Sequence, residues 1–248
     1  ASNYLYNLRK KNKLFYSLSF ETISAIDKNA ALPHYKLTKK SNLKFKQNVI
    51  YLIDSGAQYF DGTTDITRTI ILGIPTSEQK DRFTRVLKGH IALAKAKFSY
   101  NTKGSQLDYL ARKSLFDINC DYNHGTGHGI GSFLNVHEGP QRIAKKNNLG
   151  NGEIRKNMII SNEPGFYKEN EYGIRIENLI IVRNKNKSNY FFETISFAPI
   201  DLDLIEEKLL NREEKVWINN YHKKTYNLLN NKLTSKEKKW LKIATKPI

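Results

Sequence analysis

Two pairs of acidic residues in apolar surroundings are the first sign of chemistry in this sequence. Asp54 and Asp65 lie in YLIDSGAQYFDGTTDITRT. Glu163 and Glu177 lie in MIISNEPGFYKENEYGIRIENLIIV. Two carboxylates that face each other in apolar strands repel strongly, and one of them becomes neutral unless a cation lies between them. Each pair is therefore a candidate for metal ligation.

The first pair needs a particular strand register to share one ion cluster. NVIYLIDSGAQY is typical of a strand, and TTDITRTIIL of its antiparallel return across Asp61-Gly62. A tight turn there sets Asp54 opposite Thr69, which leaves Asp65 on the same face but about 13 Å along the strand. A shared site therefore requires a wider loop or a bulge. A capping or turn role for each aspartate is the alternative.

The second pair has a simpler register. The midpoint of positions 163 and 177 falls at 170, in the polar turn KENEYG, so a hairpin centred there sets Glu163 directly opposite Glu177. A metal ion between the two carboxylates would relieve their repulsion. Arg175 is the competing solution, because it lies two residues before Glu177 on the same face and could neutralise the pair.

A glycine-rich segment between the two pairs concentrates three of the six histidines. YNHGTGHGIGSFLNVHEGPQ holds His124, His128 and His137 among five glycines. Glycine lets the backbone approach a ligand closely and adopt conformations that other residues avoid. A turn-rich connector with surface histidines is the alternative, but the position between two acid pairs favours a site.

The donor set that these residues offer is rich in oxygen. One histidine with four carboxylates suits Mn²⁺, Co²⁺ or Zn²⁺, and four acids are more than one divalent ion usually needs. The pattern therefore indicates two ions. Two ions roughly 3.5–4 Å apart can bind a bridging hydroxide and polarise a carbonyl group, and hydrolases use both effects.

Helices and strands must position this set. Residues 3–20 have a helical pattern and are expected to be the last helix of something longer. Helices are also expected over 77–98, with Ser77 as the N-cap, and over 104–118. β-branched and aromatic runs predict the strands of the second acid pair and one more: 157–167, 173–183 and an edge strand near 190–198. Two strand pairs with two acids each indicate a duplicated architecture.

Length and composition bound the class of protein. The chain has 248 residues, of which 39% are hydrophobic and 26% charged, enough for the core of one large domain. Lys and Arg outnumber Asp and Glu by 41 to 24, but they are scattered among asparagines without a nucleic-acid-binding motif. Cys120 is the only cysteine, which fits a reduced cytoplasm. No apolar run approaches the ~20 residues of a membrane helix. We therefore expect neither a nucleic-acid nor a membrane partner.

Three motifs together resemble those of a known family. DSGAQYFDGTTDITRT, HGTGHGIGSFLNVHEGP and NEPGFYKENEYGIRIEN closely resemble the pita-bread metallopeptidases, and among them the Xaa-Pro aminopeptidases (aminopeptidase P) of the long, multidomain cytosolic type. The similarity runs from about Leu18 to the C-terminus. It implies a duplicated α/β pita-bread fold with two metal ions, usually Mn²⁺, in a central cleft. It also suggests a homodimer and peptide substrates with an Xaa-Pro N-terminus.

The resemblance also implies a role for each metal-site residue. Asp54 and Asp65 would be ligands, with Asp65 bridging the ions. His128 would bind one ion, and Glu177 would be a second bridging ligand. Glu163 would be a ligand that also carries the proton from the nucleophile to the leaving nitrogen.

Further residues would complete the site by the same resemblance. His137 and His124 would line the substrate pocket, with His137 stabilising the developing oxyanion. His34 would reach in from before the first strand and, with His124 and Phe133, shape a pocket for the proline ring. Arg175 would support the site behind Glu177.

The domain organisation expected from the resemblance has three parts. Residues 1–30 would be the remnant of an N-terminal helix and its lead-in, 31–200 the pita-bread catalytic domain, and 201–248 a helical tail packed on it. Trp217 and Trp240 are the expected core anchors of that tail. Long aminopeptidases P carry two further N-terminal domains, so we expect this chain to be the catalytic fragment of a larger protein.

The resemblance implies a metal-dependent aminopeptidase that removes the residue before a proline at the second position, through attack by a metal-bridging hydroxide. A prolidase or a methionine aminopeptidase with the same ligand set is one alternative. A pita-bread module that binds peptides without catalysis is another, and five filled ligand positions are hard to explain in such a module.

Overall fold

One antiparallel sheet positions the two aspartates. The computed structural model describes residues 1–145, 152–186 and 188–248. In this sheet β3 is the central strand, flanked by β2 and β6 (β2 Ile23–Ile26, β3 Val49–Ser55, β6 Ile66–Leu72). β3 and β6 pair with Asp54 opposite Thr67, not opposite Thr69. Asp65 is two residues before Thr67, so this register sets it diagonally across from Asp54 on the same face of the sheet.

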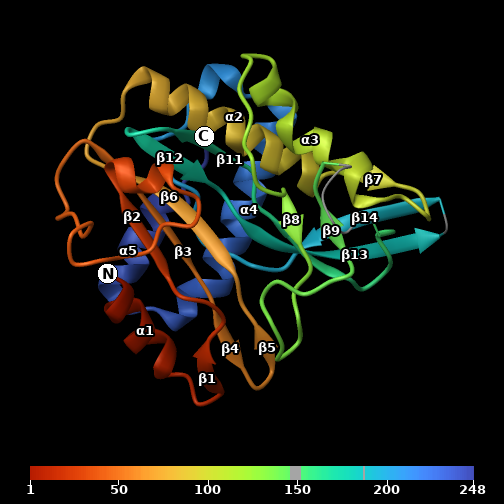
Figure 1. Ribbon diagram of the computed structural model, residues 1–248, viewed down its shortest axis with the longest axis horizontal. Coiled ribbons are helices and arrows are strands. Elements are labelled where there is room, and N and C mark those ends of the chain that lie inside the picture. The colour runs from red at the N-terminus through yellow and green to blue at the C-terminus, as the bar shows by residue number, and fades with distance from the viewer. Residues whose placement is uncertain (146–151, 187) are drawn as a thin grey trace.

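The shift in register has a visible cause. The chain between β3 and β6 forms two short strands, β4 (Ala57–Tyr59) and β5 (Gly62–Thr63). Together with β1 (Phe15–Leu18) they form a small separate sheet in which β4 is the central strand (Figure 1). The wider loop predicted for a shared aspartate site is thereby confirmed.

A second sheet and a hairpin position the two glutamates. The sheet has the strand order β10-β13-β14-β7, and the hairpin is β11-β12 (β7 Lys97–Phe98, β10 Ile159–Asn162, β11 Gly165–Lys168, β12 Tyr172–Arg175, β13 Asn178–Asn186, β14 Asn189–Thr194). Asn162 faces Asn178 in one ladder and Gly165 faces Arg175 in the other. These registers are continuous, so Glu163 and Glu177 lie opposite each other in the gap between them, as predicted. The strand expected at the edge, β14, is flanked by β7 and is not an edge.

Helices cover the sheets. α1 (Ser2–Lys10) ends before β1, so the helix predicted over residues 3–20 is wrong in its second half. α2 (Ser77–Ala94) and α3 (Gly104–Phe116) pack side by side, at the top of Figure 1. The N-cap of α2 is Thr76 rather than Ser77, because the Thr76 side chain accepts from the backbone of Gln79 in a capping box.

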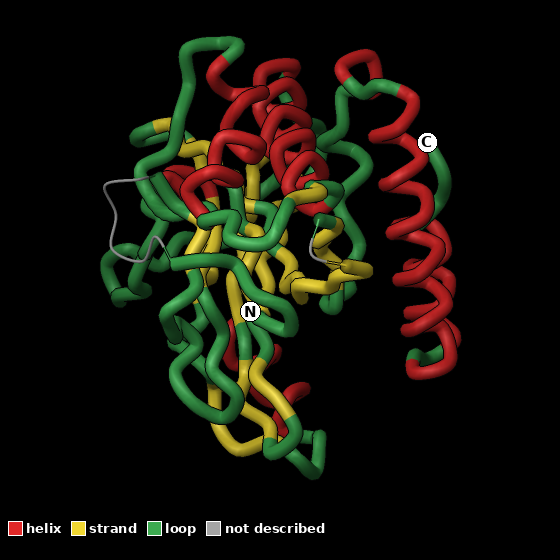
Figure 2. The backbone as a smooth tube through the Cα atoms, turned by 90° about the vertical axis from the view of Figure 1, so that its right-hand side faces the viewer, coloured by secondary structure: helices red, strands yellow, loops and turns green. Residues whose placement is uncertain are grey.

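The C-terminal residues form α4 (Arg212–Leu229) and α5 (Ser235–Ala244), which lie behind the sheets in Figure 1 and along one flank of the molecule in Figure 2. Trp217 stacks on Tyr221, with ring centroids 5.3 Å apart, and packs against the main core as predicted. Trp240 is 57% exposed, so its prediction as a core anchor is wrong. Within the described ranges no helix is long and apolar enough to cross a membrane.

Candidate metal centre

The side chains that the sequence singled out meet in one cleft. Its volume is about 970 Å³, and nine of the ten predicted metal-site and pocket residues line it: His34, Asp54, Asp65, His124, His128, His137, Glu163, Arg175 and Glu177. They come from the ends of strands in both sheets and from the glycine-rich segment, which contributes β8 (Gly127–His128), paired with β9 (Arg142–Ile143). The fold therefore brings together segments more than 100 residues apart.

Three of these residues have the closest ligand geometry. One donor atom each from Asp65, His128 and Glu177 lies within 4.8 Å of the others. His128 Nε2 is 3.4 Å from Asp65 Oδ2 and 3.4 Å from Glu163 Oε1. These are spacings between neighbouring ligands of a common ion.

The acids form a cluster of buried, mutually repelling charge. Burial raises the pKa of Asp65 well above its usual value, and the charge of Asp54 raises it further. Burial, followed by the charge of Asp65, does the same to Glu177. Burial also raises the pKa of Glu163. A divalent cation would reverse this, because it favours the ionised form of every carboxylate around it.

The donor set fits such a cation. Four carboxylates and one imidazole are the oxygen-rich ligands that Mn²⁺, Co²⁺ and Zn²⁺ accept. Asp54 Oδ1 is buried and has no hydrogen-bond partner among residues 1–145, 152–186 and 188–248. An orphaned buried carboxylate oxygen is costly unless an ion completes its coordination.

Arg175 also lines the cleft, but its side chain does not form an ion pair with the two glutamates. Its Nη2 donates to Asp54 Oδ2 at 2.7 Å, its Nη1 to Tyr167 Oη at 2.7 Å and its Nε to Thr67 Oγ1 at 3.3 Å. The guanidinium thus fixes one oxygen of Asp54 and leaves the other free to bind. The alternative in which Arg175 bonds to the glutamate pair is not what the structure has.

His124 is held as a neutral ring of defined tautomer. Burial, followed by the nearby charge of Arg175, lowers the pKa of His124 to about 3. Its Nε2 lies 2.8 Å from Tyr167 Oη, and its Nδ1 lies 2.8 Å from the Gly125 carbonyl oxygen. Arg175 can only donate to Tyr167 and a carbonyl can only accept, so Tyr167 donates to Nε2 and Nδ1 carries the proton.

His137 and His34 complete the imidazole wall of the cleft. The rings of His137 and His128 meet edge to face with centroids 4.2 Å apart. Burial, followed by the charge of His128, lowers the pKa of His137 to about 4. The side chains of His128 and His137 therefore belong to one polar patch of the cleft wall.

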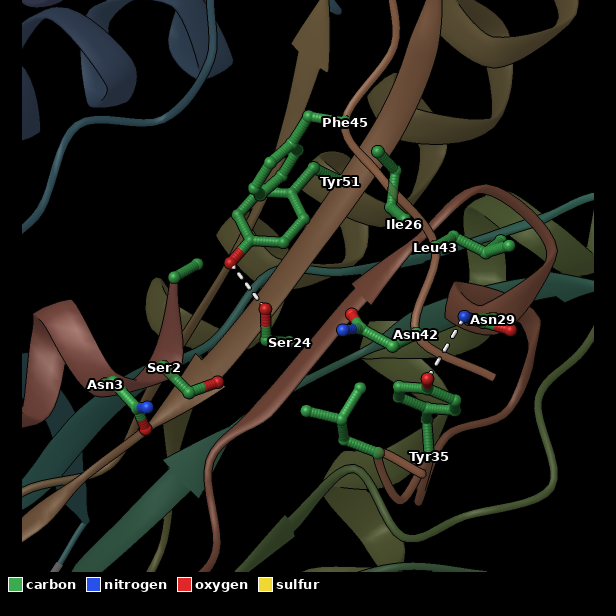
Figure 3. A pocket seen from close by; sticks show the side chains of 12 residues that line it. Ser2, Asn3, Ser24, Ile26, Asn29, Tyr35, Asn42, Leu43, Phe45 and Tyr51 are labelled. Carbon is green, nitrogen blue, oxygen red and sulfur yellow. Dashed lines mark hydrogen bonds between the residues drawn. The ribbon is translucent and has the colours of Figure 1, made fainter. Parts of the chain in front are cut away.

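His34 is placed by its neighbour Tyr35. The Tyr35 hydroxyl accepts from Asn29 Nδ2 at 3.1 Å and donates to the Ser41 carbonyl at 2.9 Å. Figure 3 shows the first of these bonds in a separate cavity of about 230 Å³ that also contains the bond between Ser24 and Tyr51. Tyr35 and Leu37 line both this cavity and the metal cleft, so the segment that carries His34 borders both, and the bonds of Tyr35 anchor it.

One predicted pocket residue lies elsewhere. Phe133 stacks on Phe60, with centroids 5.6 Å apart, and contacts Tyr16, and it is 43% exposed. Its backbone has φ of +54°, and its backbone N–H donates to Thr63 Oγ1 on β5 at 3.3 Å. In the part of the chain that the structure describes, the apolar side chains of the cleft wall come instead from the N-terminal third: Phe20, Ile23, Pro33 and Leu37.

Sequence reasoning missed several supporting residues. Tyr167 connects Arg175 to His124, and Thr67 donates to Glu177 Oε2 at 2.7 Å. Ser161 accepts from the backbone N–H of His128 at 2.9 Å and donates to Glu163 Oε1 at 3.1 Å. Thr67 lies two residues from Asp65 and Tyr167 lies four residues from Glu163, and this even spacing was the signal in the sequence that could have identified them.

Comparison with known proteins agrees with this geometry. Residues 1–184 match metallopeptidase family M24, and residues 188–248 match the C-terminal region of peptidase M24. The whole chain is 42% identical to 40% of aminopeptidase P1 from Arabidopsis thaliana. It is 46% identical to 34% of a putative Xaa-Pro aminopeptidase from Saccharomyces cerevisiae.

Solved structures give the same result. The X-prolyl aminopeptidase of Caenorhabditis elegans, described as a cytosolic enzyme with a di-nuclear active site, superposes on the whole chain with a TM-score of 0.94 and 41% identity. The chain covers 42% of that protein. Prolidase from Pyrococcus furiosus matches 79% of the chain, and 55% of its own length, with a TM-score of 0.68 and 27% identity.

The fold and the acid-histidine cluster define a pita-bread metallopeptidase domain. The chain belongs to metallopeptidase family M24. It spans about 34–42% of the length of the Xaa-Pro aminopeptidases to which it is most fully aligned.

Proposed function

We propose that this chain is the catalytic domain of a metal-dependent Xaa-Pro aminopeptidase, which releases the N-terminal residue from peptides with proline at the second position. The observation that carries the proposal is the convergence of four predicted ligand carboxylates and four histidines in one cleft. The names and the 42–46% identity of the aminopeptidase relatives support it. Residues 31–200 form the catalytic body in this proposal, preceded by a lead-in over 1–30 and followed by a supporting tail over 201–248.

Two divalent ions, most simply Mn²⁺, with Co²⁺ or Zn²⁺ as substitutes, would occupy the centre. Asp54, Asp65, His128, Glu163 and Glu177 would hold them. When bound, such ions polarise a substrate carbonyl and lower the pKa of water enough to supply a nucleophile at neutral pH. The description of the C. elegans relative as di-nuclear supports a count of two.

Glu163 is suited to move a proton. Burial raises its pKa above the usual value of a glutamate, which makes the carboxylate a stronger proton acceptor. The hydrogen bond from Ser161 to Oε1 fixes one oxygen of Glu163. The side chain can therefore take a proton from the nucleophile and deliver it to the leaving nitrogen.

His137 is suited to stabilise negative charge on the substrate. Its pKa of about 4 keeps the ring neutral at physiological pH, so it offers one N–H donor without neutralising the acids beside it. A donor already in place where charge develops lowers the barrier, because it does not need to reorient.

The preference for proline is assigned to the wall formed by His124 and His34. The nitrogen of an Xaa-Pro bond has no N–H, so the pocket needs shape rather than a hydrogen-bond acceptor. A neutral His124 ring, fixed on one edge by Tyr167 and on the other by Gly125, presents an uncharged, rigid surface to a proline ring. Arg175 supports this wall through Tyr167.

A prolidase is the second candidate, supported by the match to the P. furiosus enzyme. Prolidases cleave dipeptides, whereas the proposed aminopeptidase cleaves longer peptides, so a substrate-length series separates the two. A methionine aminopeptidase would lack the preference for proline. A purely peptide-binding module does not account for an orphaned carboxylate oxygen and three carboxyl groups of raised pKa.

Elemental analysis of the purified full-length protein tests the metal assignment. About two equivalents of Mn, Co or Zn per chain are expected, with peptidase activity lost on chelation and restored by the metal. A well-folded protein that binds no divalent ion contradicts the proposal. We further propose a cytoplasmic homodimer without nucleic-acid or membrane partners, which sedimentation and fractionation would test.

A further inference from the structure

A buried arginine lies behind the pocket wall, outside the metal centre. Arg112 on α3 is 1% exposed, and Asp108, one helical turn earlier, is 3% exposed. Arg112 Nε donates to Asp108 Oδ2 at 2.7 Å, and Nη1 donates to Asp121 Oδ1 at 2.6 Å. Removing these charges from water is costly, and a hydrophobic pair of similar volume would serve stability as well. The arrangement therefore calls for a role beyond packing.

The same guanidinium holds the segment that leads into the metal centre. Its Nη1 donates to the Tyr122 carbonyl at 2.6 Å, and its Nη2 donates to the His124 carbonyl at 2.9 Å. Its carbon lies 3.8 Å from the centroid of the Tyr122 ring. Arg112 thus fixes two alternate residues of the segment through their backbone.

Asp108 holds a third residue of the same segment. Thr126 Oγ1 donates to Asp108 Oδ1 at 2.5 Å, and Tyr122 Oη lies 2.5 Å from that same Thr126 hydroxyl oxygen. The pair on α3 consequently binds residues 122, 124 and 126 from one side. The intervening Gly125 and the following Gly127 have no side chain to restrict their backbone, so an external contact must supply the restraint.

His124 lies at the centre of these contacts. Arg112 donates a hydrogen bond to its backbone carbonyl, and the Tyr167 hydroxyl is bonded to its imidazole ring. The carbonyl carbon and the Cβ of His124 are both bonded to its Cα. Holding the carbonyl therefore also constrains the direction in which the imidazole ring leaves the backbone. Within the described ranges, the bond from Arg112 is the one hydrogen bond that joins the His124 backbone to α3.

We propose that Arg112 is a positioning residue that holds His124 in the geometry needed to select a proline ring, and that Asp108 orients Arg112 for this purpose. The inference deepens the proposed function and rests on it. A lysine cannot replace the arginine, because one ammonium group cannot serve Asp108, Asp121 and two carbonyls arranged around a planar fork.

The test uses the full-length, metal-loaded protein with Arg112→Lys. The variant should keep its metal content, raise KM for an Xaa-Pro-Yaa peptide about tenfold or more, and change kcat less. The ratio of kcat/KM for Xaa-Pro-Yaa over Xaa-Ala-Yaa should fall toward one. Arg85→Lys is the matched control, since Arg85 also pairs with an aspartate four residues earlier and donates to a carbonyl, Ser114, but does not touch the 122–126 segment.

Hydrogen exchange provides a measurement independent of activity. Amides of residues 122–128 should exchange faster in Arg112→Lys than in the wild type, and Arg85→Lys should leave them unchanged. If Arg112→Lys fails to fold, Asp108→Asn serves in its place, with a smaller effect in the same direction.

The outcomes separate this inference from the proposed function. A wild type without preference for proline refutes the proposed function. Equal selectivity and equal exchange in wild type and Arg112→Lys refute the role of Arg112, even if the variant melts at a lower temperature. Loss of metal from the variant also refutes it, because the arginine would then support the metal centre rather than the pocket.

Discussion

Thr67 and Glu177 join the two sheets across 110 residues of sequence. Thr67 Oγ1 donates to Glu177 Oε2 at 2.7 Å, and the Glu177 backbone N–H donates to the Thr67 carbonyl at 3.2 Å. Arg68, the next residue, donates through Nη1 to the Glu177 carbonyl at 2.6 Å. Each acid pair is placed by its own sheet, and this contact fixes one pair relative to the other. The geometry of the metal centre therefore depends on how the two sheets pack against each other.

Asp65→Asn should remove the metal and the activity together while the fold survives. Asp65 lies within ligand distance of both His128 and Glu177, and an amide is a poor substitute for a carboxylate that two ions must share. Elemental analysis and thermal melting check this outcome. Two metal equivalents retained by the variant would contradict the ligand assignment.

The metal-free protein should become less stable as the pH rises above about 6.5. The pKa values of Asp65 and Glu177 are raised well above their usual range by burial and by neighbouring carboxylates, so the folded state binds more protons than the unfolded state. Stability then falls as the pH rises through the interval between the unfolded and folded pKa values. Below pH about 6.5 the lowered pKa values of His124 and His137 act in the opposite direction, because unfolding lets these rings take up a proton.

Melting temperatures between pH 6.5 and 8.5 measure this dependence. Wild type without metal should lose stability relative to metal-free Asp65→Asn across this range, and added Mn²⁺ should abolish the loss. Parallel curves for the two metal-free proteins would show that the acid cluster is not strained.

His137→Ala should lower kcat about 10²–10³-fold, the size expected when one donor to a developing oxyanion is lost. Metal content should not change, because the ligand assignment does not include His137. Steady-state kinetics with a proline tripeptide and parallel metal analysis provide the measurement. A variant that changes only KM would show that His137 binds substrate and does nothing more.

Tyr167→Phe should raise KM and lower stability. Its hydroxyl accepts from Arg175 and donates to His124, so its removal leaves two buried groups unpaired, at about 1–3 kcal/mol for each group. Tyr172→Phe is the control, because that hydroxyl is bonded to Glu78 on α2, away from the cleft. Equal effects of the two substitutions on KM would remove Tyr167 from the pocket.

Local registers could be predicted from the sequence. The midpoint of Glu163 and Glu177 gave the correct hairpin, because pairing within a hairpin is fixed by its turn. The geometry around Asp54 was predicted only conditionally: the sequence required a wide loop for a shared site but did not reveal β4 and β5. Phe133 was placed in the proline pocket with His34 and His124 as a nearby apolar residue, but its ring packs against Phe60 and Tyr16 instead.

Contacts between distant elements could not be predicted. The bond between Thr67 and Glu177 depends on how two sheets pack, and no period within either segment encodes it. Trp240 is a large aromatic residue of the kind found in cores, but it lies on the exposed face of α5. Such placements follow from tertiary packing, which local patterns constrain only weakly.

The central claim is selective removal of a residue that precedes proline, and the most direct measurement compares Xaa-Pro-Yaa with Xaa-Ala-Yaa on the full-length, metal-loaded protein. Only the first residue should be released. Replacing proline by alanine should lower kcat/KM about 30- to 150-fold, or about 2–3 kcal/mol, because the ring packing and the bend at proline are lost. Comparable cleavage of the two peptides would contradict the account, and a strict requirement for dipeptides would assign the protein to the prolidases instead.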